Sequence, residues 1–391
     1  MNNLRTCMLY LKMSTGSLKC LAIGDNHFEP SNLLDVDQFI VRIEKAARRL
    51  EPDFIVLLGD ILHAHATAYM DAHVRAVRLL KTLSKYALTF LLIGNHDRRN
   101  NSDFQTDIHF FTGIELPNLV IVDHALKYKV TSRKGDAEGN FLFVPYVAPG
   151  RLYEALDTIE LDEVGEDTWR SPSIDAIFCH QEFKGVQMGP IKSEVGDFWD
   201  VSWPLVVSGH IHEYQLLQPN LLYPGTPIQH TFSEKPDKAV TLFDFNTQID
   251  ETATIAIQEV QKLEDLRPDP AIRVRYARIE LGLRLKRTVT LNVSQLATFK
   301  PNICEQTKLV LRGTVSELKA LTKSKVLDKY TLLGIKISQK PIEDKIVRVG
   351  SLVAIDPNTA RPKSFIQLFR ELIEKDEELV ATFDQLFLQR A

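Results

Sequence analysis

The chain has 391 residues, of which 44% are hydrophobic and 25% are charged, and its formal net charge at pH 7 is −4. This length is too great for one ordinary hydrophobic core and predicts a globular protein of two or three domains. The negative net charge excludes a surface that is basic throughout, so any contact with nucleic acid must use a local basic patch or a partner protein.

The cysteines and the apolar runs indicate the compartment. The four cysteines form neither a CxxC pair nor a dense framework, which favours a reducing compartment and argues against a disulfide scaffold or a zinc ribbon. No apolar run approaches the roughly 20 residues that span a bilayer, and the apolar patch at 7–11 is shorter than a signal-peptide core of about 7–15 residues. We therefore expect an intracellular protein, cytoplasmic or nuclear and not secreted, without a membrane segment.

The N-terminal part of the chain alternates between short apolar runs and amphipathic stretches. After a flexible extension over 1–17, the expected elements are a strand at 21–23, a helix at 34–50, a strand at 54–58, a helix at 68–86 and a strand at 88–93. This β-α-β-α-β order predicts an α/β core. Further strands are expected at 119–122, 127–131, 141–145, 174–178, 205–207, near 223 and at 240–245. Residues 18–262 are therefore predicted to form one layered domain.

A different pattern follows this domain. The segment 265–270 is rich in Asp and Pro and is typical of a linker. The expected elements beyond it are strands at 272–279, 308–312 and 332–337 and a helix at 316–322. They predict a small α/β domain over 270–356. Prolines then interrupt the chain, and a final helical segment is expected over 360–391.

Five short polar motifs follow predicted strands. They are Asp25-Asn26-His27, Gly59-Asp60 with His63, Gly94-Asn95-His96-Asp97, His180, and Gly209-His210-Ile211-His212. Loops at strand ends are where α/β folds place their ligand sites. Each motif alone has an ordinary explanation as a cap, a turn or a partly buried histidine. Their joint occurrence at strand ends indicates one shared site.

The residue types of these motifs suit a dinuclear metal site. Carboxylate, amide oxygen and imidazole together bind divalent metals such as Mn²⁺. In an extended chain the Asp25 and His27 side chains would lie on the same side, so both could reach one metal, and Asp60 could bridge two metals. Two metals about 3.5–4 Å apart can activate a shared water and hold a phosphate during in-line attack.

The motif series D-x-H, G-D, G-N-H-D, H and G-H-x-H resembles the signature of the calcineurin-like metallophosphoesterases over residues 18–245. The resemblance implies an α/β fold of two packed mixed β-sheets flanked by helices. It also implies metal ligands: Asp25, His27, Asp60 and His212 for metal one, and Asp60, Asn95, His180 and His210 for metal two. In the same family His96 would contact the scissile phosphate, and Asp97 would orient His96.

The second motif narrows the resemblance. Serine/threonine phosphatases carry GDxxDRG and GNHE, whereas this chain has Asp60 followed by His63 and a third motif that ends in Asp97. The GDxxH form resembles the nuclease subunit of the bacterial SbcC–SbcD complex and its phage, archaeal and eukaryotic relatives. The segments 223–227 and 232–234 are also similar to that family. In it, the counterpart of His63 assists exonuclease action; the alternative is a solvent-facing histidine at a helix start.

This resemblance implies a Mn²⁺-dependent DNA nuclease, with Mg²⁺ as the alternative metal. Expected activities are 3′→5′ exonuclease on double-stranded DNA and endonuclease on single strands, by a hydroxide that the two metals activate. The protein would be a homodimer and the subunit of a DNA repair and recombination complex with an SbcC-type, SMC-like ATPase. The alternatives are a small-molecule phosphodiesterase, acting on cyclic nucleotides or phospholipid head groups, and a non-enzymatic scaffold, which would usually lose ligands.

DNA and partner contacts are expected at four arginines and two helical segments. Arg98 and Arg99 directly follow the third motif, and Arg273 and Arg275 share one face of a predicted strand in the DNA-facing cap over 270–356. The alternatives are a polar loop and a solvated sheet face. The apolar stripe of the C-terminal segment is expected to pack on the chain itself, or, by resemblance, to bind the ATPase. The helix at 68–86 is where the family dimerises.

Overall fold

The computed structural model describes residues 16–67, 69–160, 168–246, 257–266, 272–302, 304–342 and 379–380. Two compact units divide the chain, and most of it up to Val289, with 300–309 and 334–336, forms the first. Nearly all of the predicted extension over 1–17 and of the helical segment over 360–391 lies outside the described residues. No described helix combines the length and apolar character needed to cross a membrane.

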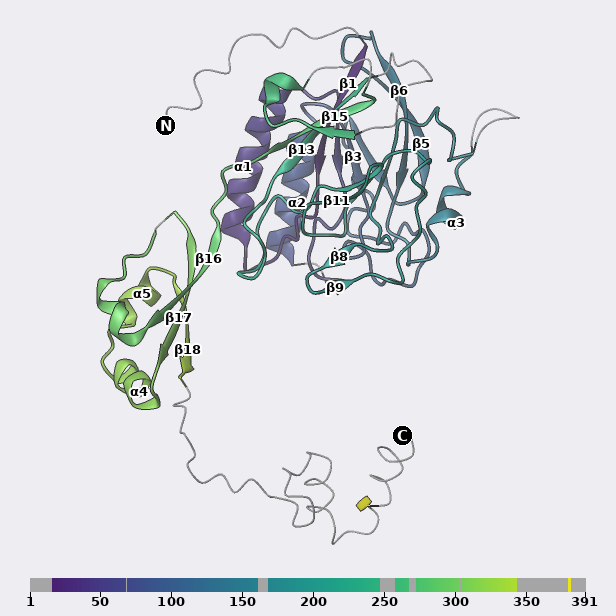
Figure 1. The fold of residues 1–391 in the computed structure, drawn as a ribbon. Helices are drawn as coiled ribbons and strands as arrows, with labels where there is room; N and C mark the ends of the chain where they lie inside the picture. The colour runs from purple at the N-terminus through teal and green to yellow at the C-terminus, as the bar shows by residue number, and fades with distance from the viewer. Residues whose placement is uncertain are drawn as a thin grey trace. The chain divides into compact units, whose positions relative to one another are not determined.

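The first unit contains a seven-stranded mixed sheet with the order β14-β15-β13-β1-β2-β3-β4 (Figure 1). Its strands are β1 (Ser17–Ile23), β2 (Phe54–Leu57), β3 (Leu88–Leu92), β4 (Leu119–Val122), β13 (Val240–Asn246), β14 (Ile257–Glu259) and β15 (Val274–Ile279). Strands β1 to β4 are parallel, and a helix makes the crossover connection from β1 to β2 and from β2 to β3. Strand β13 runs antiparallel to β1 and to β15.

A second mixed sheet has six strands in the order β11-β12-β10-β7-β6-β5. They are β5 (Leu126–Thr131), β6 (Glu138–Val144), β7 (Ala176–Cys179), β10 (Val206–Ser208), β11 (Gln215–Gln218) and β12 (Leu221–Tyr223). The central strands β6, β7, β10 and β12 are parallel to one another. A short hairpin of β8 (Gln187–Met188) and β9 (Ile191–Lys192) and the helix α3 (Leu152–Leu156) complete this part of the chain.

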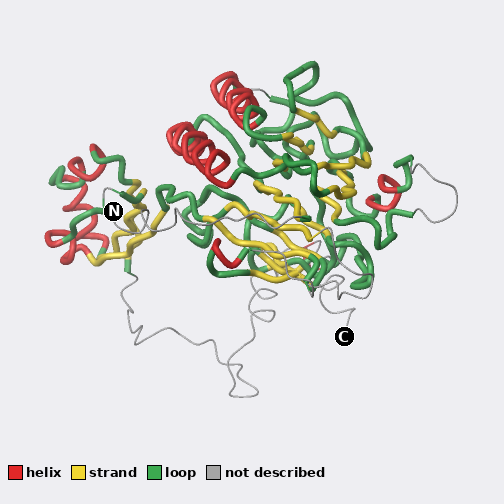
Figure 2. Tube along the Cα trace, turned by 90° about the horizontal axis from the view of Figure 1, so that it is seen from above, coloured by secondary structure: helices red, strands yellow, loops and turns green. Residues whose placement is uncertain are grey.

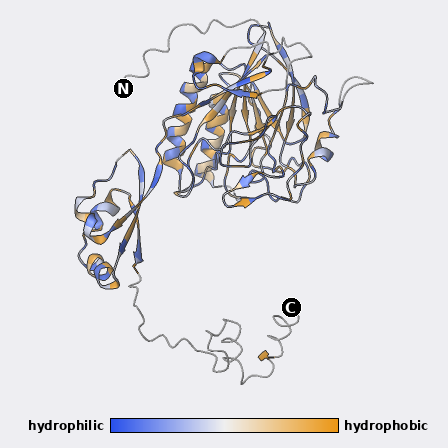
Figure 3. Cartoon of the chain, viewed as in Figure 1, coloured by the Kyte–Doolittle hydropathy of each residue, from blue (hydrophilic) through white to orange (hydrophobic). Residues whose placement is uncertain are grey.

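Three apolar clusters hold the described part of the first unit together, one of them formed by the six-stranded sheet with α3 and neighbouring loops. Side chains from both sheets meet in one cluster, in which the rings of Phe90 and Phe143 stack with centroids 3.9 Å apart. The helices α1 (Leu33–Leu50) and α2 (Met70–Leu83) lie side by side and pack on the other face of the seven-stranded sheet (Figure 2). Both helices carry hydrophilic and hydrophobic residues, whereas the central strands are mostly hydrophobic (Figure 3). This pattern is typical of helices with one buried face and of strands buried on both faces.

The predicted α/β fold of two mixed sheets flanked by helices is confirmed. Helix α1 ends close to the predicted residue because Glu51 takes a left-handed conformation, with φ 47°, and its N–H bonds to the carbonyl of Ala47. Pro52 follows and has no N–H with which to continue the helix.

The strand expected at 272–279 differs from the prediction in its sheet partner. It is β15, which pairs with β13 along its whole length in the seven-stranded sheet. Residues up to Val289 accordingly cluster with the first unit. The alternating pattern of this segment identifies a strand but does not identify its neighbour, because pairing depends on the register of a distant segment.

The second unit contains residues 290–299, 310–333 and the described residues from Ile337 onward. Three helices lie within it: η2 (Val293–Thr298), α4 (Val315–Lys323) and α5 (Asp328–Leu332). It also includes part of each strand of a three-stranded sheet: β16 (Lys286–Asn292), β17 (Gln306–Gly313) and β18 (Lys336–Pro341). Thr314 begins α4 with a capping box that includes Glu317. The strand predicted at 332–337 begins only at Lys336, because α5 ends at Leu332 and Gly334 makes a turn with φ 75°.

Candidate metal centre

The loops that follow five strands converge at one place in the first unit. Strands β1, β2 and β3 are parallel neighbours, as are β7 and β10 in the second sheet, so their carboxyl ends meet. The residues predicted as metal ligands lie in these loops: Asp25, His27, Asp60, Asn95, His180, His210 and His212. Six of them fall into two groups whose potential ligand atoms lie within 4.8 Å of one another. Asn95 joins the second group through its side-chain oxygen.

The first group consists of Asp25, His27 and His212. The Nε2 atoms of His27 and His212 are 2.9 Å apart, and Nε2 of His27 lies 4.0 Å from Oδ2 of Asp25. The other carboxylate oxygen of Asp25 accepts a hydrogen bond of 3.0 Å from the backbone N–H of His210. Oδ2 of Asp25 is buried and has no hydrogen-bond partner within the described residues. A buried carboxylate oxygen of this kind is stabilised when a cation occupies the place beside it.

The second group consists of Asp60, His180 and His210. Oδ1 of Asn95 lies 3.0 Å from Nε2 of His180 and 3.0 Å from Nδ1 of His210. The other ring nitrogen of His180 donates a hydrogen bond of 2.7 Å to the carbonyl of Leu58. In the neutral ring this bond places the proton on Nδ1, so Nε2 is the nitrogen that can bind a metal.

Asp60 lies between the two groups. Its Oδ2 atom is 3.7 Å from Nε2 of His27 and 3.4 Å from Nε2 of His180. The backbone reaches this position in a left-handed conformation, with φ 50° at Asp60 and 101° at Gly59. Gly94 leaves the space that the carboxylate fills, since a Cβ there would overlap Oδ1 of Asp60. The geometry suits a carboxylate that bridges two cations.

Burial and mutual charge govern the protonation of the two groups. Burial would raise the pKa of Asp60, but His180, His27 and His96 hold it well below its ordinary value. Burial lowers the pKa of His180, yet Asp60 and Asp25 raise it to about 9. Burial and the charge of His180 lower the pKa of His210 to about 3. Buried carboxylates and imidazoles of this kind are consistent with a binuclear metal site, because two divalent cations neutralise the carboxylates and accept the nitrogen lone pairs.

The buried ion pair of Glu234 and Lys238 lies beside His212, on the side of its Nδ1 atom. Nδ1 of His212 lies 3.8 Å from Oε1 of Glu234, and Nζ of Lys238 lies 3.0 Å from the other oxygen of Glu234. Lys238 also donates to the carbonyl of His212, at 3.1 Å. Carboxylates that hold the outer nitrogen of a ligating histidine fix its ring orientation. The sequence pointed to this segment, because Glu234 ends the motif at 232–234.

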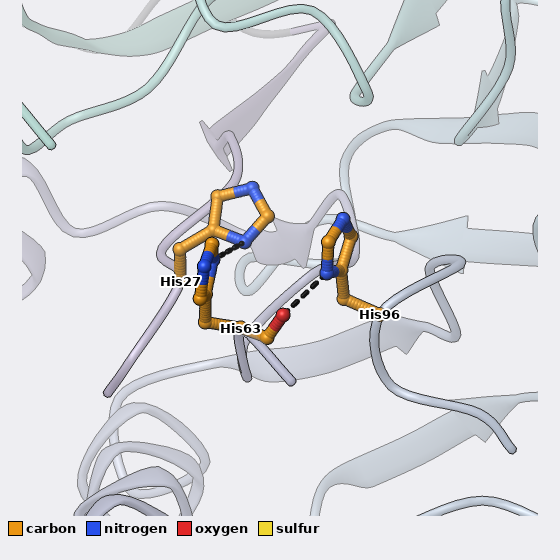
Figure 4. Close-up of side chains that lie close together, drawn as sticks. All are labelled: His27, His63 and His96. Atoms are coloured by element: carbon orange, nitrogen blue, oxygen red, sulfur yellow. Dashed lines mark hydrogen bonds between the residues drawn. The ribbon is translucent and has the colours of Figure 1, made fainter. Parts of the chain in front are cut away.

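His63 and His96 lie beside the first group, as the close-up of His27, His63 and His96 shows (Figure 4). Nδ1 of His63 is 3.4 Å from Nδ1 of His27. Nδ1 of His96 bonds to the carbonyl of His63, and the backbone N–H of His96 donates to Oδ1 of Asp60, at 2.8 Å. Nε2 of His96 therefore faces the centre, 4.0 Å from Oδ2 of Asp60.

Asp97 differs from its predicted role. Its buried carboxylate accepts hydrogen bonds from the backbone N–H groups of Gly94, Ile61 and Leu62, at 3.0 to 3.3 Å. The bond that orients His96 comes instead from the carbonyl of His63. Burial, followed by the charge of Asp60, raises the pKa of Asp97 to about 7. Asp97 thus joins the loops of the second and third motifs, and it acts on His96 only through their backbones.

Arg98 also differs from its prediction, because its side chain is buried. Its guanidinium donates to the carbonyls of Tyr146 at 2.8 Å, of Asn100 at 2.9 Å, and of Asp103. With 1% of its surface exposed, it is not available to DNA phosphates. Arg99 is half exposed and pairs with Asp103 at 2.8 Å. Of the two arginines, only Arg99 stays a candidate for DNA contact.

Arg273 and Arg275, predicted to bind DNA, make contacts within the chain. Arg273 donates to the carbonyl of Pro172 at 2.6 Å, and Arg275 donates to Gln258 at 3.1 Å. The nearby Arg278, Arg284 and Arg287 form ion pairs with Asp237, Asp35 and Glu305. A run of arginines in the sequence does not reveal such pairs, because the acidic partners come from distant segments.

Two further histidines near the centre were not predicted. The ring of His65 stacks on His96, with centroids 4.1 Å apart. The ring of His230 lies 5.2 Å from that of His27 and 5.6 Å from that of His212. Burial lowers the pKa of His230 to about 3. Only their positions in the sequence could have identified these two histidines: His65 follows His63 closely, and His230 precedes the motif at 232–234.

Comparisons with known proteins agree with this centre. The family model described as "Calcineurin-like phosphoesterase" matches residues 18–214. "Putative phosphoesterase 244L" of Invertebrate iridescent virus 6 is 35% identical over 315 residues, which cover 79% of this chain and 99% of the relative. "Putative phosphoesterase 078R" of Invertebrate iridescent virus 3 is 32% identical over 321 residues, which cover 82% and 83%. Neither name states a substrate.

Proposed function

Since the chain belongs to the calcineurin-like phosphoesterase family, we propose that this metal-dependent phosphoesterase is a DNA nuclease. The activities proposed are 3′→5′ exonuclease on double-stranded DNA and endonuclease on single strands, with Mn²⁺ as the metal. We further propose that it is the nuclease subunit of an SbcC–SbcD-like complex in the repair and recombination of double-strand breaks. The partners would be DNA and an SMC-like ATPase inside the cell.

The observation that carries the DNA proposal is the position of His63. This histidine distinguishes the GDxxH motif from that of the serine/threonine phosphatases, and its ring lies 5.2 Å from that of His27, beside the first metal group. Its carbonyl also accepts the hydrogen bond from Nδ1 of His96. The side chain of His63 is 52% exposed, so it faces solvent as well as the centre, but it does not lie at a helix start, because α2 begins only at Met70. The proposal assigns to His63 an action with His96 on a substrate strand.

The chain's own residues divide the work of hydrolysis. Two divalent cations, when bound, supply an activated water and neutralise the charge of the phosphate. Asp25, His27 and His212 would hold one cation and His180, His210 and Asn95 the other, with Asp60 shared. Because Nδ1 of His96 donates to the carbonyl of His63, Nε2 is the nitrogen that faces the substrate. The neutral ring carries its proton on Nδ1, so Nε2 can deliver a proton to the leaving oxygen of the phosphodiester once the ring has been protonated at both nitrogens, which the negative charge of a bound phosphate favours.

A homodimer is proposed through the surface of α2. Met70 and Val74 in the first turns of this helix are exposed apolar side chains, and Tyr69 precedes them. Contiguous exposed apolar residues of this kind favour a protein partner. The segment proposed to bind the ATPase, 360–391, lies almost wholly outside the described residues.

A small-molecule phosphodiesterase is the second candidate. It is favoured because the arginines predicted to bind DNA are mostly buried or bonded within the chain. Arg98 is buried, and the basic side chains at 273–287 are bonded within the chain. With a net charge of −4, the protein would bind DNA weakly through phosphate contacts of its own. A nuclease of this composition would depend on a partner for part of its DNA affinity.

One assay separates the two candidates. The protein with Mn²⁺ is incubated with end-labelled linear duplex DNA and, in parallel, with cyclic nucleotides, and the His96→Ser variant serves as the control. The nuclease proposal predicts DNA cleavage that the variant loses. Hydrolysis of cyclic nucleotides with intact DNA would refute the nuclease proposal and leave the metal-dependent phosphoesterase.

A further inference from the structure

His230 is a partly buried residue whose ring lacks hydrogen-bond partners among the described residues. Both of its ring nitrogens are buried, and neither has a hydrogen-bond partner in the part of the chain that the structure describes. An unpaired buried donor or acceptor lowers the stability of a fold, so a ring with two such atoms requires an explanation. Water, a metal ion or a substrate group can supply the missing partner.

The backbone, and not the ring, holds His230 in this place. Its N–H donates to Oε2 of Glu234 at 3.0 Å, and its carbonyl accepts from Nζ of Lys286 at 2.9 Å. The neighbouring Gln229 side chain both accepts from and donates to the backbone of Lys286, at 2.8 and 3.0 Å. These bonds fix the backbone from which the imidazole projects before any ligand arrives, and a fixed backbone lowers the entropic cost of binding.

The ring is directed toward the first metal group. It meets His27 edge to face, with an interplanar angle of 88°, and lies 5.6 Å from the ring of His212. His96, which faces the same group, lies 4.9 Å from His27. His230 nevertheless belongs to none of the donor groups whose atoms come within 4.8 Å of one another. Its position therefore suits a molecule bound beside the metal better than the metal itself.

We propose that His230 is a substrate-binding residue that donates a hydrogen bond to a non-bridging phosphate oxygen of the bound phosphodiester. An imidazole carries at least one N–H in either protonation state. The nearby Lys238 and Lys286 are paired with Glu234 and Asp35, at 3.0 and 3.9 Å, so recognition of the anion would depend on the ring N–H and not on the local net charge. The inference rests on the proposed hydrolysis of phosphodiesters, and it holds for DNA and for small diesters alike.

The test compares His230→Leu, which removes both ring nitrogens, with His230→Gln, which keeps an N–H donor. Binding of inorganic phosphate to the Mn²⁺-loaded full chain is measured by calorimetry, and KM and kcat are measured with bis(p-nitrophenyl) phosphate. His73→Leu is the matched control, because Nδ1 of His73 is also buried without a partner among the described residues but lies on α2. Bound Mn²⁺ and the thermal midpoint are recorded for every variant.

The proposal predicts that His230→Leu weakens phosphate binding and raises KM by about tenfold or more. His230→Gln should stay within about threefold of the parent, because it restores the donor. Bound Mn²⁺ should be unchanged in both variants, and His73→Leu should affect neither phosphate binding nor KM. The thermal midpoint of His230→Leu should rise, because an unpaired polar group has been removed.

Two results would overturn the proposal. Parental phosphate affinity in His230→Leu would show that the ring does not contact the anion, and loss of Mn²⁺ would show that the ring serves the metal. If His230→Leu does not fold, His230→Phe supplies a second ring without donors and is judged by the same measurements. A parent protein that hydrolyses no diester would refute the proposed function, while its phosphate calorimetry would still decide the role of His230.

Discussion

Asp244 provides a quantitative test of the packing between the strands of the seven-stranded sheet. It lies on β13 between Lys19 of β1 and Arg275 of β15, and only 3% of its surface is exposed. Oδ1 of Asp244 has no hydrogen-bond partner within the described residues. Burial raises its pKa to about 6, from 3.8 for an ordinary aspartate, although Ser17 and Lys19 oppose the rise.

The sign of the effect follows from proton binding. The folded state holds this proton more tightly than the unfolded chain does, so the carboxylate destabilises the fold wherever both states are ionised. That cost is complete above pH 6 or so and absent below pH 4 or so. A pKa difference of about 2 corresponds to about 3 kcal/mol. Asp244→Asn, which keeps the shape and never ionises, is therefore expected to be more stable than the parent by up to about 3 kcal/mol at neutral pH.

Urea unfolding followed by tryptophan fluorescence measures this difference. The measurements use metal-free protein at about pH 4 and about pH 7.5, with Asp107→Asn at an exposed site as the control. The advantage of Asp244→Asn should appear at the higher pH and vanish at the lower. A variant that is less stable than the parent at neutral pH, or equally stable at both, would refute the reasoning.

Three further predictions concern the centre and its supports. Gly94→Ala should reduce bound Mn²⁺ and hydrolysis together, because a Cβ there overlaps Asp60; a variant with parental metal content would contradict this. Arg98→Ala should lower the free energy of unfolding by roughly 3 kcal/mol or more, because buried carbonyls lose a charged donor. Arg99→Ala, at an exposed ion pair, should change little, and equal effects in urea unfolding would refute the distinction. Removal of divalent metal with EDTA should abolish hydrolysis and lower the thermal midpoint of unfolding. Added Mn²⁺ should restore both properties in the parent protein but not in Asp60→Asn. A thermal midpoint that is insensitive to EDTA would argue against a structural contribution from the metals.

The sequence predicted that the metal ligands lie close together, because the signal for each ligand is its position directly after an apolar run. Asp25, His27 and Asp60 each follow an apolar run, and the carboxyl ends of parallel strands meet at one edge of a sheet. The order of the motifs then suffices to bring together residues as distant as Asp25 and His212. The fold class follows from the same alternation of strands and helices.

The roles of Asp97 and Arg98 could not be predicted in this way. The partners of Asp97 are backbone N–H groups of another loop, and one partner of Arg98 is the carbonyl of Tyr146. Such contacts depend on how distant loops fold back, which the residue types do not record. The position of His230 beside His27 has the same cause, since it depends on bonds between its loop and Lys286.

The number and coupling of bound Mn²⁺ ions test the central claim most directly. The protein is depleted of metal, titrated with Mn²⁺ and analysed by electron paramagnetic resonance. The account predicts two ions per chain with an exchange-coupled signal, because Oδ2 of Asp60 lies within 3.7 Å of ligand nitrogens in both groups. It also predicts that Asp60→Asn loses the coupling. Binding of a single uncoupled ion, or of none, would contradict the two-metal centre.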